Sequence, residues 1–130
     1  MEIKKIDPLV VEMKDEGVLP RAIGVTTPRT SSHPLGKADH FTTAIWECSP
    51  GRFPWTYPDA ELMHILAGAA TFTPDVGEPI SFRAGDTLFF PSGVSGQWDV
   101  IETIRKVYAI FIAASSGGPP ILLGKNDQFG

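Results

Sequence analysis

The sequence predicts a single all-β domain, on three observations. Short runs rich in β-branched and aromatic residues recur along the chain from residue 42 onward. The 13 glycines and 12 prolines are spread along the whole chain, a distribution more typical of many short strands than of helices. The 130 residues are enough for one domain with its own core. A β-sandwich or a small barrel is therefore expected, with strand edges closed into the barrel or paired in a dimer.

Eight strands are expected, and most of them are bounded by turn residues. They cover residues 42–48, 53–57, 61–67, 69–73, 80–83, 87–90, 97–101 and 104–113. The turns between them contain glycine, proline or aspartate, as in Ser49-Pro50-Gly51 and Pro91-Ser92-Gly93. The longest expected strand is the last one.

Three regions follow from this pattern. Residues 1–41 are expected to form an N-terminal arm and loop, extended in its first part and polar over residues 20–40. Residues 42–116 are expected to form the β-barrel. Residues 117–130 are expected to be a C-terminal tail that packs on the barrel or on a partner protomer, because Gly117-Gly118-Pro119-Pro120 fits neither a helix nor a central strand.

Composition excludes several classes of function. The formal net charge is −4 and no basic cluster is present, so no nucleic-acid partner is expected. The N-terminus has no apolar signal core, and the longest apolar run is too short to cross a bilayer, so no membrane partner is expected. The single cysteine, Cys48, forms no intramolecular disulfide and no cysteine-based zinc site. A cytoplasmic location is the simplest expectation.

Two blocks of the sequence resemble the motifs of the cupin superfamily. Glu61 and Gly68 match the glutamate and the glycine of the first cupin motif. Gly85, Pro91 and Gly93 match three markers of the second motif. The resemblance implies a cupin jelly-roll barrel, also called a double-stranded β-helix.

Four further segments are similar to one branch of the cupins, the (S)-ureidoglycine aminohydrolase-like branch. They are residues 46–51, 53–57, 96–98 and 105–108. Much of that branch has no established activity, so the resemblance is specific for the branch and not for a reaction.

The resemblance also implies a metal site, but this chain lacks the residues for it. Cupin metal sites use three histidines and the glutamate, since neutral imidazole suits divalent transition metals and a carboxylate adds charge. Here Trp55 and Tyr57 stand where the histidine pair would be, and Gly96 stands where the third histidine would be. Only Glu61 remains, so no metal of the usual cupin kind and no cofactor are expected.

Glu61 and Tyr57 are the candidate catalytic residues. Strand alternation places Met63 and Ile65 on the same face as Glu61, and the cupin resemblance implies that this face lines the barrel. Burial favours the neutral form of a carboxyl group, which makes Glu61 a candidate general acid or base. The alternative is a purely structural carboxylate held by Tyr57 or Lys106.

Trp55, Trp98, Lys106 and Tyr108 are the candidate ligand-binding residues. The two tryptophans either offer a stacking surface to a small ligand or fill space in the core. Lys106 or Arg105 is a candidate for binding a carboxylate group, although both faces of the last strand mix polar and apolar residues and leave its inner face open.

Neither the histidines nor the cysteine is expected to be functional. His33, His40 and His64 match no metal-ligand spacing, and Cys48 is expected to be an inert buried thiol.

The sequence thus predicts a homodimeric, small-molecule-binding cupin without the usual metal. Its ligand would be a small polar molecule in the barrel. Two alternatives stay open: an (S)-ureidoglycine aminohydrolase-like enzyme, and a metal-independent acid/base enzyme such as an epimerase or isomerase.

Overall fold

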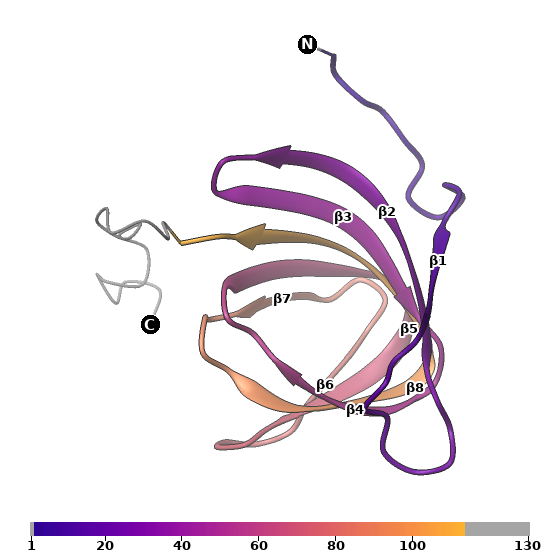
Figure 1. Ribbon diagram of the computed structural model, residues 1–130, viewed down its shortest axis with the longest axis vertical. Coiled ribbons are helices and arrows are strands. Elements are labelled where there is room, and N and C mark those ends of the chain that lie inside the picture. Colours follow the sequence, from indigo (N-terminus) through magenta and orange to yellow (C-terminus); the bar gives the residue numbers. More distant parts are fainter. Residues whose placement is uncertain (1, 114–130) are drawn as a thin grey trace.

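The computed structural model describes residues 2–113 (Figure 1). Within this range the chain forms eight β-strands and no helix. The strands are β1 (Lys14–Val18), β2 (Arg29–Ala38), β3 (Phe41–Cys48), β4 (Gly51–Thr56), β5 (Ala60–Pro74), β6 (Ile80–Arg83), β7 (Thr87–Phe90) and β8 (Ser95–Phe111). All pairings between them are antiparallel. In this part of the chain, no helix is long and apolar enough to span a membrane.

Two long strands, β5 and β8, organise the barrel. They pair with each other over almost their full length, and each takes part in both halves of the fold. The second half of β8 pairs with β3, and its first half pairs with β4. The first half of β5 pairs with β7, and its second half pairs with β6. The curved sheet that results wraps around one interior, as Figure 1 shows, and this is the single-domain jelly roll that was expected.

The interior is packed mainly with aromatic side chains. Trp98, Phe53 and Phe72 are each about 1% exposed, which places them in the centre of the core. The Trp98 ring stacks on Phe53 with centroids 6.1 Å apart and meets Phe72 and Phe82 edge-on. Such stacked and edge-on pairs are the preferred geometries of aromatic rings.

The prediction of a turn at Gly68 is wrong, because β5 continues through it. Residues 61–67 and 69–73 belong to one strand, and residues 97–101 and 104–113 likewise belong to one strand, β8. The pairing of β5 with β8 shifts register on both sides of Gly68, which has a φ of +87°. Gly68 therefore allows a bend inside β5, a position in strands where glycine is common.

The prediction of a polar loop over residues 20–40 is wrong for Arg29–Ala38. This segment is β2, which pairs with β3 at eight positions. Its polar side chains lie on a strand near the sheet edge, where one face meets solvent. Pro34 lies beside an irregularity in the pairing, a position that tolerates proline in a strand. The predicted tail at residues 117–130 lies outside the described residues.

Candidate functional site

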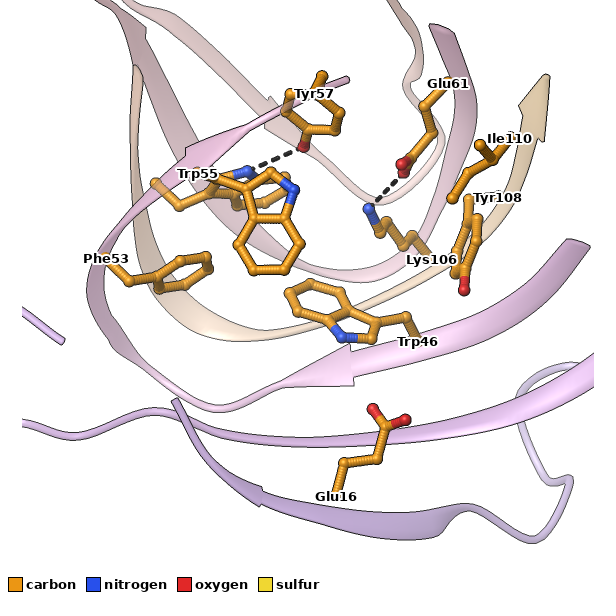
Figure 2. A pocket seen from close by; sticks show the side chains of 10 residues that line it. Glu16, Trp46, Phe53, Trp55, Tyr57, Glu61, Lys106, Tyr108 and Ile110 are labelled. Atoms are coloured by element: carbon orange, nitrogen blue, oxygen red, sulfur yellow. Dashed lines mark hydrogen bonds and ion pairs between the residues drawn. The ribbon is translucent and has the colours of Figure 1, made fainter. Parts of the chain in front are cut away.

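A cavity of about 210 Å³ opens into the barrel (Figure 2). Its lining consists of ten residues, Glu16, Trp46, Phe53, Trp55, Tyr57, Glu61, Trp98, Lys106, Tyr108 and Ile110. All three tryptophans and both tyrosines of the chain are among them. The cavity also brings together six residues proposed from sequence for catalysis or ligand binding, whereas Arg105, the alternative to Lys106, forms an ion pair with Glu47 instead. It is smaller than the roughly 300–1,000 Å³ typical of sites for drug-sized molecules, so it suits a small ligand.

A buried ion pair between Lys106 and Glu61 lies in this cavity. The Lys106 Nζ atom donates to Glu61 Oε2 at 2.7 Å, and each side chain is only 7% exposed. β5 contributes Glu61 and the neighbouring β8 contributes Lys106, so one strand pairing holds both (Figure 2). Of the two partners proposed for a structural Glu61 carboxylate, Lys106 is the one that contacts it.

Three aromatic rings surround the Lys106 ammonium group. The Nζ atom lies 4.8 Å from the ring centroid of Trp46, 5.4 Å from that of Trp98 and 5.2 Å from that of Tyr108. These distances are within the range of cation–π attraction, which stabilises the charged form of the lysine. Burial lowers the pKa of Lys106, and the nearby Glu61 charge opposes that shift.

Tyr57 lies deeper, beside the ion pair, at the end of β4. Its hydroxyl oxygen accepts a hydrogen bond from Trp98 Nε1 at 3.0 Å, and its ring packs on Phe90 with centroids 4.5 Å apart. Burial, followed by the charge of Glu61, raises the pKa of Tyr57 well above its usual value of 10.0. The phenol therefore keeps its proton at neutral pH, so in proton transfer it can act as an acid and not as a base.

The two candidate tryptophans occupy different depths. Trp98 is 1% exposed and belongs to the core, whereas Trp55 is 39% exposed and stands at the mouth of the cavity. Trp55 lies on β4 directly opposite Gly96 of β8, and its ring meets Phe53 edge-on. Trp55 is the more available of the two for contact with a ligand.

Comparison with known protein families identifies the chain. The model of the EutQ-like cupin domain matches residues 35–108, which is more than half of the sequence. The chain belongs to the EutQ-like cupin domain family. No curated protein matches the sequence.

Several solved structures are similar to this cupin domain. A Thermotoga maritima protein of the DUF861 family is 36% identical over 52% of this chain and 76% of its own, with a TM-score of 0.51. A Pseudomonas syringae DUF861 protein of unknown function is 22% identical, with a TM-score of 0.71 over 81% of this chain and 46% of its own. The Clostridium difficile EutQ protein is 20% identical, with a TM-score of 0.59 over 65% of this chain and 69% of its own. The last two likenesses show the fold alone.

The residues of this cupin domain do not fit the usual cupin metal. A side chain added at Gly96 would meet the Thr73 carbonyl oxygen and the Phe72 ring, so no room exists there for a histidine. The Lys106 ammonium group already neutralises Glu61 and would repel a divalent cation. Within residues 2–113, no group of three or more His, Cys, Asp or Glu side chains is arranged to hold a metal ion.

Two of the histidines and the cysteine have structural partners outside the cavity. The Nδ1 atom of His64 lies 2.8 Å from the Thr87 hydroxyl oxygen, and that of His33 lies 2.9 Å from the Glu12 carbonyl oxygen. Cys48 is fully buried, and burial raises the pKa of its thiol from 9.0 to about 12. A thiol of this kind is unreactive at neutral pH.

Sequence reasoning missed four of the lining residues, Glu16, Trp46, Phe53 and Ile110. Trp46 pairs directly with Lys106 across β3 and β8, and Ile110 pairs with Glu61 across β8 and β5. Strand alternation places Ile110 on the same face of β8 as Lys106, but the sequence leaves open whether that face is internal. Glu16 carried no usable signal, because it lies in a segment that was expected to be a surface arm.

Proposed function

We propose that this cupin domain binds a small polar organic molecule in its barrel cavity and does so without a metal. The observation that carries the proposal is the Lys106–Glu61 ion pair, which lies in an aromatic-walled cavity that opens to solvent beside Trp55. Burial of two charges in an apolar setting costs solvation free energy, and a charged pair in a cavity that opens to solvent is a candidate functional group.

Lys106 has hydrogen-bonding capacity left for a ligand. An ammonium group has three N–H donors, and one of them binds Glu61. Its other contact with an acceptor among residues 2–113 is to the weak acceptor Met63 Sδ at 3.9 Å. A ligand oxygen atom can take a remaining donor, while Trp55 and Tyr108 offer ring surface to the rest of the ligand.

A calorimetric and thermal-shift screen tests this proposal. The compounds are small carboxylates, amines, amino acids, ureido compounds and sugars, and the protein is purified with a chelator. A true ligand at one hundred times its Kd stabilises the native protein by about 2.7 kcal/mol. The matched control is the double variant Glu61→Gln with Lys106→Met, which removes both charges and keeps the side-chain sizes. A ligand that stabilises this variant equally does not use the ion pair and would count against the proposal.

A second candidate function is proton transfer without a metal. Glu61 and Lys106 lie 2.7 Å apart and are buried, so together they can hold or exchange one proton next to a bound substrate. This supports an epimerase or isomerase in which Glu61 acts as the base and Tyr57 or Lys106 acts as the acid. Exchange of a ligand C–H proton with deuterated solvent, lost in Glu61→Gln, is the expected sign of this activity.

An (S)-ureidoglycine aminohydrolase activity has weaker support. The similarity of residues 46–51 and 53–57 to that branch favours it, but the metal ligands that would perform the reaction are replaced by Trp55, Tyr57 and Gly96. Ammonia release from ureidoglycine by the chelator-treated protein is the observation that would establish it.

We also propose that the protein works as a cytoplasmic homodimer.

A further inference from the structure

A carboxylate from the N-terminal strand stands at the mouth of the cavity. Glu16 of β1 lines the cavity together with Trp46 and Tyr108, and Figure 2 shows its carboxylate directed toward Trp46. The Ser32 hydroxyl donates to Glu16 Oε2 at 2.9 Å. Among residues 2–113 the other oxygen, Oε1, has no hydrogen-bond partner. One acceptor is therefore open to a ligand.

An irregularity in β1 sets the position of Glu16. Asp15 pairs with Ser31 and Gly17 pairs with Thr30, so Glu16 is the extra residue of a β-bulge. Gly17 has a φ of +86°, a conformation that glycine adopts without strain. Bulges of this kind redirect one side chain and are enriched beside binding sites. The bulge therefore accounts for a carboxylate at the cavity instead of along the strand edge.

The charges around the cavity favour a cation at its mouth. Lys106 cancels the charge of Glu61, and Glu16 leaves one net negative charge on the lining. Burial raises the pKa of Tyr108, as do the charges of Glu61 and Glu16, which fits a carboxylate close to this ring. The Trp46 and Tyr108 rings already engage the Lys106 ammonium group, whose Nζ atom lies 4.8 Å and 5.2 Å from their centroids, so the attraction for a ligand cation comes from the Glu16 carboxylate.

The floor of the cavity, where Lys106 lies, favours a hydrogen-bond acceptor and disfavours a cation. The Lys106 ammonium group would repel a ligand cation, and its remaining N–H donors require an acceptor. A ligand that satisfies both ends carries its positive charge at the mouth and an oxygen acceptor at the floor.

We propose that Glu16 is a specificity-determining residue that selects ligands with an ammonium group at one end and an oxygen acceptor at the other. The ammonium group binds Glu16, and the oxygen accepts a hydrogen bond from Lys106. This inference rests on the proposed binding function and assigns the chemical class of its ligand. The family model matches residues 35–108, so Glu16 lies outside the matched residues.

Three matched probes test the inference: aminobutanol, butanediol and hydroxybutyrate. Each has a short carbon chain with a hydroxyl group at one end, and the other end is cationic, neutral or anionic. Because all three tryptophans line the cavity, their indole N–H signals in nitrogen–proton correlation spectra report binding there. We expect 4-aminobutanol to bind roughly three- to tenfold more tightly than 1,4-butanediol, because only the amine gains an ion pair with Glu16. The carboxylate of 4-hydroxybutyrate can turn toward Lys106 and away from Glu16, so its affinity should not depend on Glu16. The preference should shrink as salt is added.

Substitution of Glu16 separates this inference from the proposed function. Glu16→Gln should abolish the preference for the amine and leave the Kd of butanediol unchanged. The control, Glu12→Gln, removes the same charge from an exposed residue outside the cavity lining and should change nothing. Equal affinities for aminobutanol and butanediol, or a preference for the amine that survives Glu16→Gln, would overturn the inference and leave the binding function standing. If neither these probes nor the wider compound screen moves any indole signal, the binding function fails, and the inference fails with it.

Discussion

The Lys106 ammonium group supplies the positive charge beside the Glu61 carboxylate inside the barrel. Both side chains are almost fully buried, 2.7 Å apart, and three aromatic rings enclose the cation. Removing one member of a buried pair leaves the other charge without compensation, whereas removing both is far less harmful. The pair therefore acts as a unit in stability as well as in binding.

Glu61→Gln should lower the free energy of unfolding by about 3–5 kcal/mol, because it leaves Lys106 buried without its counter-charge. Adding Lys106→Met should recover most of that loss. Urea denaturation monitored by tryptophan fluorescence measures both changes. Equal stability of the single variant and the wild type would show that the ion pair is solvated.

Cys48 makes stability depend on alkaline pH. Burial raises the pKa of its thiol from 9.0 to about 12, so above pH 9.0 the unfolded chain loses the thiol proton while the folded protein keeps it. The stability that comes from keeping the Cys48 thiol protonated is fully present below pH 9.0, and it is lost as the pH rises toward about 12.

The free energy of unfolding should consequently fall as pH rises above 9.0, and it should fall less steeply in Cys48→Ala. Tyr57 and Tyr108, whose pKa values are also raised, add a loss of the same sign in both proteins. Denaturation midpoints measured across this pH range test the difference. Parallel curves for the two proteins would show that the thiol is accessible to solvent.

At the residue scale the sequence predicted six of the residues that line the cavity but not the contacts between them. Residue types sufficed for Glu61, Tyr57 and Trp55, since these stand at motif positions. The role of Lys106 could not be derived, because both faces of its strand mix polar and apolar residues. Only the pairing of β8 with β3 and β5 shows that the Lys106 face is internal.

At the scale of elements, the bends in β5 and β8 turn two long strands into parts of both halves of the barrel. At Gly68 the β5 backbone passes so close to Thr103 of β8 that an added side chain would meet the Thr103 carbonyl group. Sequence patterns cannot distinguish such a glycine from one that ends a strand, which explains why one strand was predicted as two.

Gly68→Ala should therefore destabilise the protein by about 3 kcal/mol or more, through both backbone strain and the clash with β8. Gly93→Ala is the matched control. Gly93 also has a positive φ, +92°, but an added side chain would meet nothing within 4 Å. The free energy of unfolding of the Gly93→Ala variant should fall by only about 1–2 kcal/mol, through backbone strain. Thermal or urea unfolding measures both losses, and equal losses would contradict the close approach.

The N-terminal strands show the limit of pattern reasoning for whole elements. β2 is polar and contains Pro34, features that usually mark a loop. It forms a strand because its neighbour β3 offers a full edge of hydrogen-bonding groups, which is a tertiary effect. The same pairing positions β1, and with it Glu16, beside the cavity.

At the scale of the whole molecule, the jelly roll could be predicted because the turns between strands and the glycines of the two motifs can be recognised in the local sequence. Assembly is a separate question. One chain has a mass of 14.1 kDa. We expect sedimentation equilibrium of the full chain to give twice this mass, because pairing of two protomers covers exposed strand edges. A mass equal to one chain would rule out the proposed homodimer.

The central claim is that the cavity binds small polar molecules through its own side chains and not through a metal. Titration of the tryptophan indole N–H signals with the small-molecule panel, with and without a chelator, tests it most directly. We expect saturable shifts that the chelator leaves unchanged and that the variant carrying both Glu61→Gln and Lys106→Met loses. Shifts that appear only when a divalent metal is added would contradict it.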